Sequence, residues 1–572
     1  MRLFLRQVCF TRTLHPSSSS FRHSSSRSIF SPVNETGTTK PFFVTTPIFY
    51  VNASPHIGHL HSIVLSDVLA RYAKLRHPSR PVFLTTGTDE HGLKIQQAAK
   101  GKGKGEKEFC DDVSMRFRDL ARKANIDNDV FIRTTEPRHI SAVQHFWSRL
   151  VASGDIYKST HSGWYSISDE TFFSASQVEK RDGKMVALET GNEVTWEEEE
   201  NYKFRLSRYV PQLRKWLERP GVVYPENQRL NLLNQLDTLE DLSVSRPASR
   251  VRWGVPVPGD ETQTVYVWVD ALVNYLTVLG YPEKTHGWPV DVHVVGKDIV
   301  KFHALHWPAL LMSAALPPPN HILAHAHWTM NHTKMSKSLG NVIDPFSALD
   351  HFTPDGLRWY LLRVGGSLSS DADFSLEGVE VQYKLLADQM GNLLSRMCSD
   401  KILGKVEEDG IGMSDLGEGE KRLSGEREIW ERDNEMDILL SDMKIRWEER
   451  MEVYGVSKAC EGIMEVVASA NRLFTSLSPW STSPAKATRA IMYSYNSLRL
   501  SAILLQPIIP DKSSELLDRL GIPVDERKWE DASWSEGIES GMNRPRMVLR
   551  RLKEGSLIWR DKKYLWPPLE GK

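Results

Sequence analysis

The chain has 572 residues, of which 40% are hydrophobic and 25% charged, a composition typical of a globular protein with about three to five domains. The formal charge of −1 excludes a protein that coats nucleic acid through bulk positive charge. Four cysteines exclude a disulfide scaffold, and no apolar run reaches the roughly 18 residues of a membrane-spanning helix, so we expect no membrane partner.

The N-terminus differs from the rest of the chain in charge. Before the first acidic residue, Glu35, there are no lysines, many serines and five arginines, which are Arg2, Arg6, Arg12, Arg22 and Arg27. An Arg-rich and Ser-rich segment without acidic residues is typical of an organellar transit peptide, although an ordinary tail would also fit. We predict a mitochondrial transit peptide over residues 1–35, which leaves a more acidic chain.

Strand-like and helical patterns alternate after this segment. Residues 42–51 (FFVTTPIFYV) predict a buried strand, residues 55–76 carry apolar side chains at helical spacing, and residues 81–90 predict a second strand. Such alternation is typical of a parallel, doubly wound sheet. The sequence therefore predicts a Rossmann-type α/β domain whose first half is residues 41–153.

The pattern then changes twice along the chain. Short hairpin-like pieces over residues 154–245 predict an insertion, after which the α/β pattern returns over residues 246–345. A linker over residues 346–385 follows. Apolar residues at helical spacing predict an all-α bundle over residues 386–572, with a solvated connection at residues 405–440.

The first motif with a chemical meaning is His56-Ile57-Gly58-His59, at the start of the first predicted helix. A helix N-terminus attracts phosphate, a glycine lets a nucleotide approach the backbone, and two imidazoles can donate hydrogen bonds to phosphate oxygens. Taken alone, the pair could also be surface histidines or part of a metal site.

The second motif, Lys334-Met335-Ser336-Lys337-Ser338, precedes a Leu-Gly pair. Two lysines among small residues suit a mobile loop that binds phosphate, because lysine supplies a compact point charge. A solvated basic turn is the alternative for the pentapeptide by itself.

Together the two motifs resemble the signature of the class I aminoacyl-tRNA synthetases. The segments TTPIFYVNASPHIGHLHS, TTGTDEHGLKIQQAA, RVRWGVPVP, VYVWVDALVNY, VVGKDIVKFHALHWPALL and HWTMNHTKMSKSLGNVIDP are similar to the methionyl-tRNA synthetases, in their short mitochondrial and bacterial form. The resemblance implies ATP-dependent ligation of L-methionine to tRNA(Met) through a methionyl-adenylate, with release of pyrophosphate and AMP, for mitochondrial translation in the matrix.

The resemblance also assigns residues to ATP. His56, His59, Lys334 and Lys337 would be catalytic, and the ATP-binding residues would be Gly58, His59, Gly296, Asp298 and Lys337. Mg²⁺ would accompany the phosphates. Since methionine itself attacks the α-phosphorus, catalysis would depend on positioning and electrostatics rather than on an enzyme nucleophile.

A methionine pocket is implied in the same way. Asp89 would pair with the α-ammonium group, and His303 and Tyr50 would orient the substrate against an apolar wall suited to a thioether. Plain core packing is the alternative for Trp268 and Trp307. The implied pocket is Ile48, Tyr50, Asp89, Trp268, Ala271, Leu272, Tyr275, Ile299, His303 and Trp307.

The helical bundle would read the anticodon through Asn392, Arg396 and Trp480. Asn392 and Arg396 are four residues apart and share a helix face, and aromatic rings stack on splayed RNA bases. A helix cap for Trp480 and a surface charge for Arg396 are the alternatives. The short form of the family implies a monomer.

The sequence departs from the family at the zinc knuckles that many members carry in the insertion. Ser166 and Asp169 stand where cysteines often occur, and no cysteine lies between Cys110 and Cys398. We therefore expect no zinc and no other metal site in the protein. His325 and His327 would share one face of a strand but lack companion ligands.

Three other functions fit the sequence less well. The isoleucine, valine and leucine enzymes of class I carry far larger insertions, and the cysteine enzyme uses zinc. A small nucleotidyltransferase would lack the helical bundle. A catalytically inactive RNA-binding module is disfavoured because both signature motifs are intact.

Overall fold

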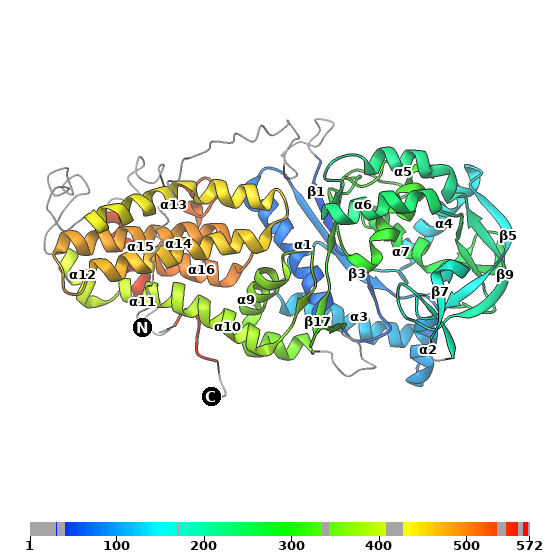
Figure 1. Cartoon of the computed structure of the whole chain (residues 1–572), viewed down its shortest axis with the longest axis horizontal. Coiled ribbons are helices and arrows are strands. Elements are labelled where there is room, and N and C mark those ends of the chain that lie inside the picture. The colour runs from blue at the N-terminus through cyan, green and yellow to red at the C-terminus, as the bar shows by residue number, and fades with distance from the viewer. Residues whose placement is uncertain are drawn as a thin grey trace, which may run out of the picture.

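The computed structural model describes residue 30 and residues 40–169, 171–181, 183–334, 343–407, 427–534, 545–558 and 564–569. The molecule is elongated, with a helical bundle at one end and an α/β region at the other (Figure 1). The predicted transit peptide lies outside the described residues except for Phe30. No helix within the described ranges is both long enough and apolar enough to cross a membrane.

A seven-stranded parallel sheet forms the centre of the α/β region. Its strands are largely buried, as expected for a sheet covered on both faces, and follow the order β10-β16-β15-β1-β3-β2, with β4 also on β3. The strands are β1 (Phe42–Thr45), β2 (Phe49–Tyr50), β3 (Val82–Asp89), β4 (Val130–Arg133), β10 (Val223–Tyr224), β15 (Val292–Gly296) and β16 (His321–His325).

The strand order reverses direction between β1 and β15. Val44 of β1 pairs in parallel with Val292 of β15 on one side and with Leu84 of β3 on the other. Open parallel sheets bind ligands in the crevice outside the carboxyl ends of the strands at such a reversal. We therefore expect a ligand site at the carboxyl ends of β1 and β15.

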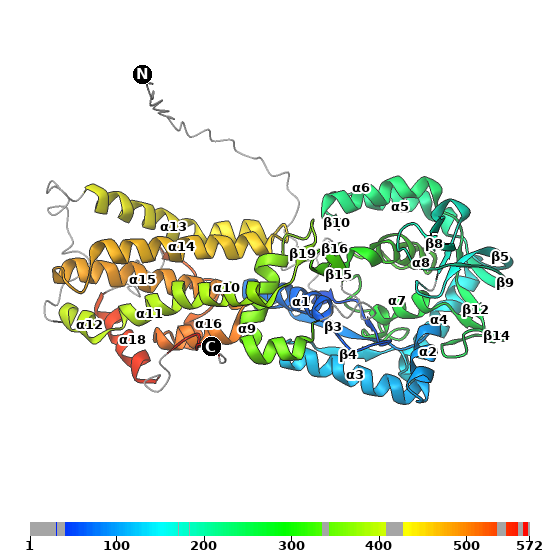
Figure 2. The same ribbon diagram turned by 60° about the horizontal axis from the view of Figure 1, so that its bottom comes forward.

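Helices cover both faces of this sheet and follow its strands in the chain. The predicted helix at residues 55–76 is α1 (Ile57–Arg76), which lies beside the sheet near the middle of the molecule (Figure 2). The other helices of this region are α2 (Leu93–Gly101), α3 (Glu106–Lys123), α4 (Pro137–Ala152), α7 (Val267–Thr277), α8 (Trp307–Ser313) and the π-helix Phe302–His306.

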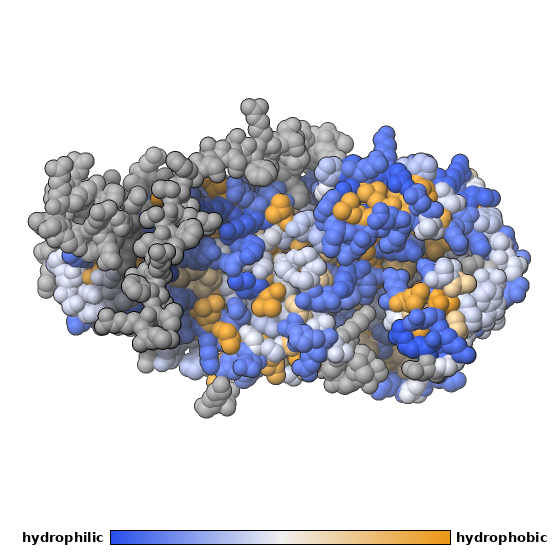
Figure 3. Space-filling view, in the orientation of Figure 1, coloured by the Kyte–Doolittle hydropathy of each residue, from blue (hydrophilic) through white to orange (hydrophobic). Residues whose placement is uncertain are grey.

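An antiparallel region lies at the end of the molecule farthest from the helical bundle (Figures 1 and 2). Leu230 in α6 is 48% exposed, and Figure 3 shows apolar side chains gathered over α5 and α6 on an otherwise mostly hydrophilic face. The elements are β5 (Ile156–Ser166), β6 (Thr171–Phe173), β7 (Val178–Arg181), β8 (Lys184–Ala187), β9 (Thr195–Phe204), α5 (Val210–Leu217), α6 (Glu226–Gln235), β11 (Leu242–Ser243), β12 (Ser245–Pro247), β13 (Pro256–Val257) and β14 (Asp260–Val265).

The rest of the chain is mainly helical. A small sheet combines two strands that precede α9 (Pro345–Gly365) in the chain with one that follows it. These strands are β17 (Trp328–Met330), β18 (Thr333–Lys334) and β19 (Ala372–Asp373). The bundle then contains α10 (Leu376–Leu386), α11 (Asn392–Met397), α12 (Asp400–Glu407), α13 (Arg427–Met451), α14 (Val456–Leu477), α15 (Pro484–Leu505), α16 (Pro510–Arg519) and α18 (Pro545–Ile558). The predicted fold class, a split Rossmann-type domain followed by a helical bundle, is confirmed.

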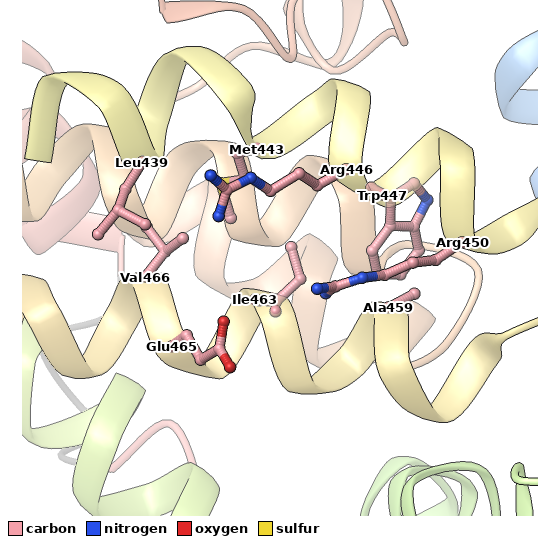
Figure 4. A pocket seen from close by; sticks show the side chains of 10 residues that line it. Leu439, Met443, Arg446, Trp447, Arg450, Ala459, Ile463, Glu465 and Val466 are labelled. Carbon is pink, nitrogen blue, oxygen red and sulfur yellow. The ribbon is translucent and has the colours of Figure 1, made fainter. Parts of the chain in front are cut away.

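The expected connection at residues 405–440 is wrong in part, because α13 begins within it. Met436, Leu440, Met443 and Trp447 recur at helical spacing and are buried. Figure 4 shows Leu439 of α13 beside Val466 of α14. The acidic residues of this stretch conceal one apolar face, which the packing against α14 buries.

A buried guanidinium group joins the α/β region to the bundle. Arg358 of α9 forms an ion pair with Asp67 of α1, 2.6 Å between Nη2 and Oδ2, and neither side chain is exposed to solvent. The same guanidinium donates to the carbonyls of Ile508 and Pro507, each at 2.9 Å, between α15 and α16. It also donates to the carbonyl of Ala124 at 3.3 Å, just after α3.

We expect Arg358→Met to destabilise the protein by about 3 kcal/mol, because it removes one of the two guanidinium partners of buried Asp67, leaving only Arg71 at 2.8 Å, and deprives two buried carbonyls of their donor. Chemical denaturation followed by circular dichroism would measure this as a lower transition midpoint. The control is Arg446→Met, which breaks an ion pair with Asp442 whose side chains are 45% and 44% exposed. Equal midpoints for the two variants would contradict this assignment.

Candidate functional site

His56 and His59 form a reciprocal cap at the N-terminus of α1. The amide of Gly58 donates to Nδ1 of His56, and the amide of His56 donates to Nδ1 of His59, both at 3.1 Å. Because each Nδ1 accepts a hydrogen bond, each neutral ring carries its proton on Nε2. The two imidazoles therefore present Nε2 donors at a helix end that favours anions.

Two further contacts fix this motif. The ring of His59 lies edgewise against Phe49 and Phe117, at centroid distances of 5.2 Å each. A Cβ on Gly58 would lie 2.9 Å from Cε1 of His56, which is too close for a side chain. Glycine at this position is thus required by the neighbouring imidazole, a reason that the sequence pattern does not reveal.

Gly296 and Asp298 lie on the other side of the crevice, at the end of β15. A Cβ on Gly296 would lie 2.7 Å from Oδ1 of Asp298, so the loop is closed tightly on itself. The Asp298 side chain is 51% exposed, and its Oδ1 lies 3.1 Å from Nε2 of His327. The structure thus places both predicted nucleotide residues at the strand end where the sheet order reverses.

His325 and His327 do not form the strand pair that the sequence suggested, because β16 ends at His325. His325 is buried, donates from Nδ1 to the carbonyl of Ala326 at 2.9 Å, and accepts at Nε2 from the Ser62 hydroxyl of α1 at 2.7 Å. His327 instead approaches Asp298. The two histidines therefore serve different contacts, one to α1 and one to the loop after β15.

The lysine motif is described only at its beginning. Lys334 ends β18, where its backbone pairs with Thr329 of β17. Lys337 lies outside the described residues, as do Met335, Ser336 and Ser338. The structure therefore shows the hairpin that precedes this loop but tests neither lysine side chain.

The largest group of predicted methionine residues meets between α7 and the π-helix Phe302–His306. The hydroxyl of Tyr275 donates to Nε2 of His303 at 2.8 Å, while Nδ1 of His303 donates to the carbonyl of Ile299 at 3.0 Å. Burial lowers the pKa of His303 to about 4, so this imidazole is neutral at physiological pH. Ala271 and Leu272 lie on the same α7 segment as Tyr275 and are buried.

The two tryptophans of the predicted pocket have different surroundings. Trp268 is partly buried and stacks on Phe302 with centroids 3.7 Å apart and planes at 7°. Trp307 is fully buried and contacts Phe146 and Trp288 at 5.8 and 5.9 Å. Trp268 thus offers an aromatic wall, whereas the contacts of Trp307 agree with core packing.

The remaining predicted methionine residues lie at the ends of β2 and β3. Tyr50 and Asp89 are parallel partners there, and Ile48 precedes them at a partly buried position. Asp89 itself is 9% exposed.

A buried carboxylate links the two groups of residues. Asp270 of α7 lies 2.6 Å from Nδ1 of His91, just after β3, and 2.8 Å from Nε2 of His139 in α4. Burial raises the pKa of Asp270, but His91 and His139 outweigh that effect and lower it to about 2. Asp270 is therefore an anion that holds α7 against the end of β3.

In the bundle, two of the three predicted anticodon residues share one cluster. The guanidinium of Arg396 lies 5.2 Å from the ring of Phe474 and pairs with Oδ1 of Asn471. The ring of Trp480, 37% exposed, lies 6.4 Å from Phe474. Asn392 donates instead to Asp388 at 3.3 Å on the same stretch of helix.

Sequence reasoning missed several residues at these places. Phe302, His91 and Asp270 lie beside quoted motif residues, but only the fold reveals that they contact Trp268 or one another. Asn471, which is partly buried, and Phe474, which is fully buried, are three residues apart near the end of α14. Nothing in the local pattern indicates that α14 places them opposite Arg396.

Comparison with protein families gives two matches. Residues 42–398 match the family described as "tRNA synthetases class I (M)". Residues 426–545 match the family described as "Anticodon binding domain of methionyl tRNA ligase".

Individual proteins agree with this result. The human mitochondrial methionine–tRNA ligase is 43% identical over 503 residues, 85% of this chain and 84% of its own length. A probable mitochondrial methionine–tRNA ligase of Schizosaccharomyces pombe is 42% identical over 515 residues, 86% of this chain and 92% of its own.

A solved structure agrees as well. The Mycobacterium tuberculosis methionyl-tRNA synthetase in complex with methionyl-adenylate is 35% identical, with a TM-score of 0.78 over 86% of this chain and 96% of that one. Since the sequence, the fold and the arrangement of motifs all agree, the chain belongs to the methionine–tRNA ligases of the class I aminoacyl-tRNA synthetases.

Proposed function

We propose that this protein ligates L-methionine to tRNA(Met) in the mitochondrial matrix, with ATP as the second substrate. The observation that carries the proposal is the reciprocal cap of His56 and His59 at the N-terminus of α1, beside the reversal of strand order. Its relatives are mitochondrial ligases, and the arginine-rich N-terminus agrees with that location.

In the first step, a carboxylate oxygen of methionine attacks the α-phosphorus of ATP, and pyrophosphate leaves. The Nε2 donors of His56 and His59 would stabilise the charge that builds up on the phosphate oxygens, together with Lys334 and Lys337. Mg²⁺ would enter with ATP, bound to its phosphates. Gly296 and Asp298 would hold the adenosine.

Methionine would lie between α7 and the end of β3. Trp268 and Tyr275 offer aromatic faces to the thioether, and Asp89 would accept the α-ammonium group. Neutral His303 would orient the substrate through its bond to Tyr275. The proposed pocket also contains Ile48, Tyr50, Ala271, Leu272, Ile299 and Trp307.

In the second step, a hydroxyl of the terminal ribose of the tRNA attacks the carbonyl of the adenylate, and AMP leaves. Residues 41–153 and 246–345 would form the catalytic domain, and residues 346–385 the linker to an anticodon-binding domain over residues 386–572. Arg396 and Trp480 would contact anticodon bases, since Phe474 holds both in one cluster, and Asn392 would join them.

We also propose that the protein acts without zinc and as a monomer. In the insertion, residues 154–245, the Asp169 carboxylate accepts hydrogen bonds from Thr190 at 2.8 Å and Asn192 at 2.7 Å, and Ser166 accepts from the Asp169 amide at 3.1 Å. These bonds join the two loops of the insertion. Light scattering would test the monomer.

Methionine-dependent exchange of pyrophosphate into ATP tests the proposed reaction. We expect methionine to stimulate exchange well above every other amino acid, and His59→Ala to reduce it by about a hundredfold or more, because a donor to the developing charge is lost. Exchange that does not depend on methionine would refute the proposal.

The anticodon assignment predicts a selective defect for Trp480→Ala. Loss of a stacked base costs about 1–3 kcal/mol, so tRNA charging should fall about fivefold to a hundredfold at limiting tRNA. Pyrophosphate exchange should not change, since Lys405 of α12 donates to the Trp480 carbonyl and α12 lies at the end of the molecule away from the α/β region (Figure 1). Tyr564→Ala, which removes a ring that is 51% exposed, is the control. Equal losses in both assays would exclude the assignment.

Zinc independence predicts that a zinc-specific chelator leaves exchange and charging intact when Mg²⁺ is supplied. Elemental analysis of the purified protein should find less than stoichiometric zinc. Loss of activity on chelation, restored by added zinc, would show that the protein needs this metal.

A further inference from the structure

A short acidic segment between α9 and α10 contacts both sides of the proposed ATP site. Asp371 lies just before β19, and Asp373 ends it. β19 pairs in parallel with β17, so that Trp328 is opposite Ala372 and Thr329 is opposite Asp373. None of the motifs in the sequence includes this segment.

Asp371 binds Lys297, which precedes Asp298 in the chain, and His327, whose ring contacts Asp298. Both of its carboxylate oxygens accept from Nζ of Lys297, at 2.7 and 2.8 Å. Oδ1 also accepts from the amide of His327 at 2.9 Å, and Nε2 of His327 lies 3.1 Å from Asp298. One carboxylate thus fixes both the residue before Asp298 and the imidazole that touches it.

Asp373 binds the hairpin that leads to the lysine loop. Its Oδ1 accepts from the Thr329 hydroxyl at 2.7 Å and from the His332 amide at 2.9 Å. His332 and Asn331 form the turn between β17 and β18, with φ of 58° and 52°. This left-handed conformation is uncommon outside glycine, although Asn and His adopt it more readily than most residues, and the bond from the His332 amide to Asp373 stabilises the turn just before Thr333.

The charges agree with this geometry. Partial burial raises the pKa of Asp371, but its bonds from Lys297 and the His327 amide outweigh that effect and lower it. The Lys297 and Asp371 side chains are 35% and 39% exposed. Ion pairs exposed to this degree contribute little to the stability of a protein. We therefore expect the pair of Lys297 and Asp371 to affect the local geometry of the loop after β15 rather than the stability of the fold.

We propose that Asp371 and Asp373 are positioning residues for adenylate formation. Asp371 orients Asp298 toward the ribose of ATP, and Asp373 holds the β17–β18 hairpin that ends at Lys334. The proposal rests on the proposed function, because it takes Asp298 and Lys334 as parts of the ATP site.

The first test is Asp371→Asn in methionine-dependent pyrophosphate exchange. The KM for ATP should rise by about threefold to tenfold, as is typical for residues that act through a neighbour, while the KM for methionine and the melting temperature do not change. Lys297→Met should have a similar effect. The double variant should be no worse than either single variant, since both changes remove one interaction.

The second test is Asp373→Asn. Here kcat for exchange should fall by about threefold to tenfold with little change in the KM for ATP, because Lys334 acts on the charge that develops in the transition state. Glu380→Gln is the matched control for both tests, since it breaks an exposed ion pair with Lys384 in the adjacent α10. It should alter none of these values.

The outcomes separate this inference from the proposed function. If the unmodified protein shows no methionine-dependent exchange, the proposed function is wrong. If it does, the inference alone is overturned by unchanged kinetics in Asp371→Asn and Asp373→Asn, by equal rises in both KM values, or by additive losses for Lys297 and Asp371. A lower melting temperature with unchanged KM and kcat would make the residues merely structural.

Discussion

The buried ion pair between Arg358 and Asp67 is the contact on which the arrangement of the two halves depends. Both charges are removed from water, which is costly unless every donor finds an acceptor, and the guanidinium meets this condition with carbonyls of two other segments. α1 therefore cannot shift without disturbing the turn between α15 and α16. Because α1 also carries His56 and His59 at its N-terminus, the orientation of this proposed catalytic motif is fixed relative to the bundle.

The site is assembled from strand ends that the sheet brings together, and buried polar groups hold these ends in place. Asp270 links α7 to the end of β3 through His91, and Ser62 links α1 to β16 through His325. Each link joins segments far apart in the chain. A rigid frame of this kind suits a reaction without an enzyme nucleophile, in which the rate depends on how accurately two substrates are positioned.

Local patterns predicted much of this protein. The spacing of apolar residues predicted the alternation of strands and helices, the helix after β1 and the helical bundle. The two signature motifs identified the family. The prediction of a connection over residues 405–440 failed at residues 427–440, where the acidic composition of α13 concealed a helix face that packs against α14, while residues 408–426 lie outside the described ranges. It also failed at His327, because β16 ends two residues earlier.

The sequence by itself determined the fold class, the family and the position of the helix end that we propose binds phosphate, since these depend on residues close together in the chain. Only the tertiary structure decided which side chains meet. It buried Trp307 in the core while Trp268 stacked on Phe302, and it brought Asp371 and Asp373 to the proposed ATP site from the far side of α9. Such contacts depend on how elements distant in the sequence pack, and no local periodicity encodes them.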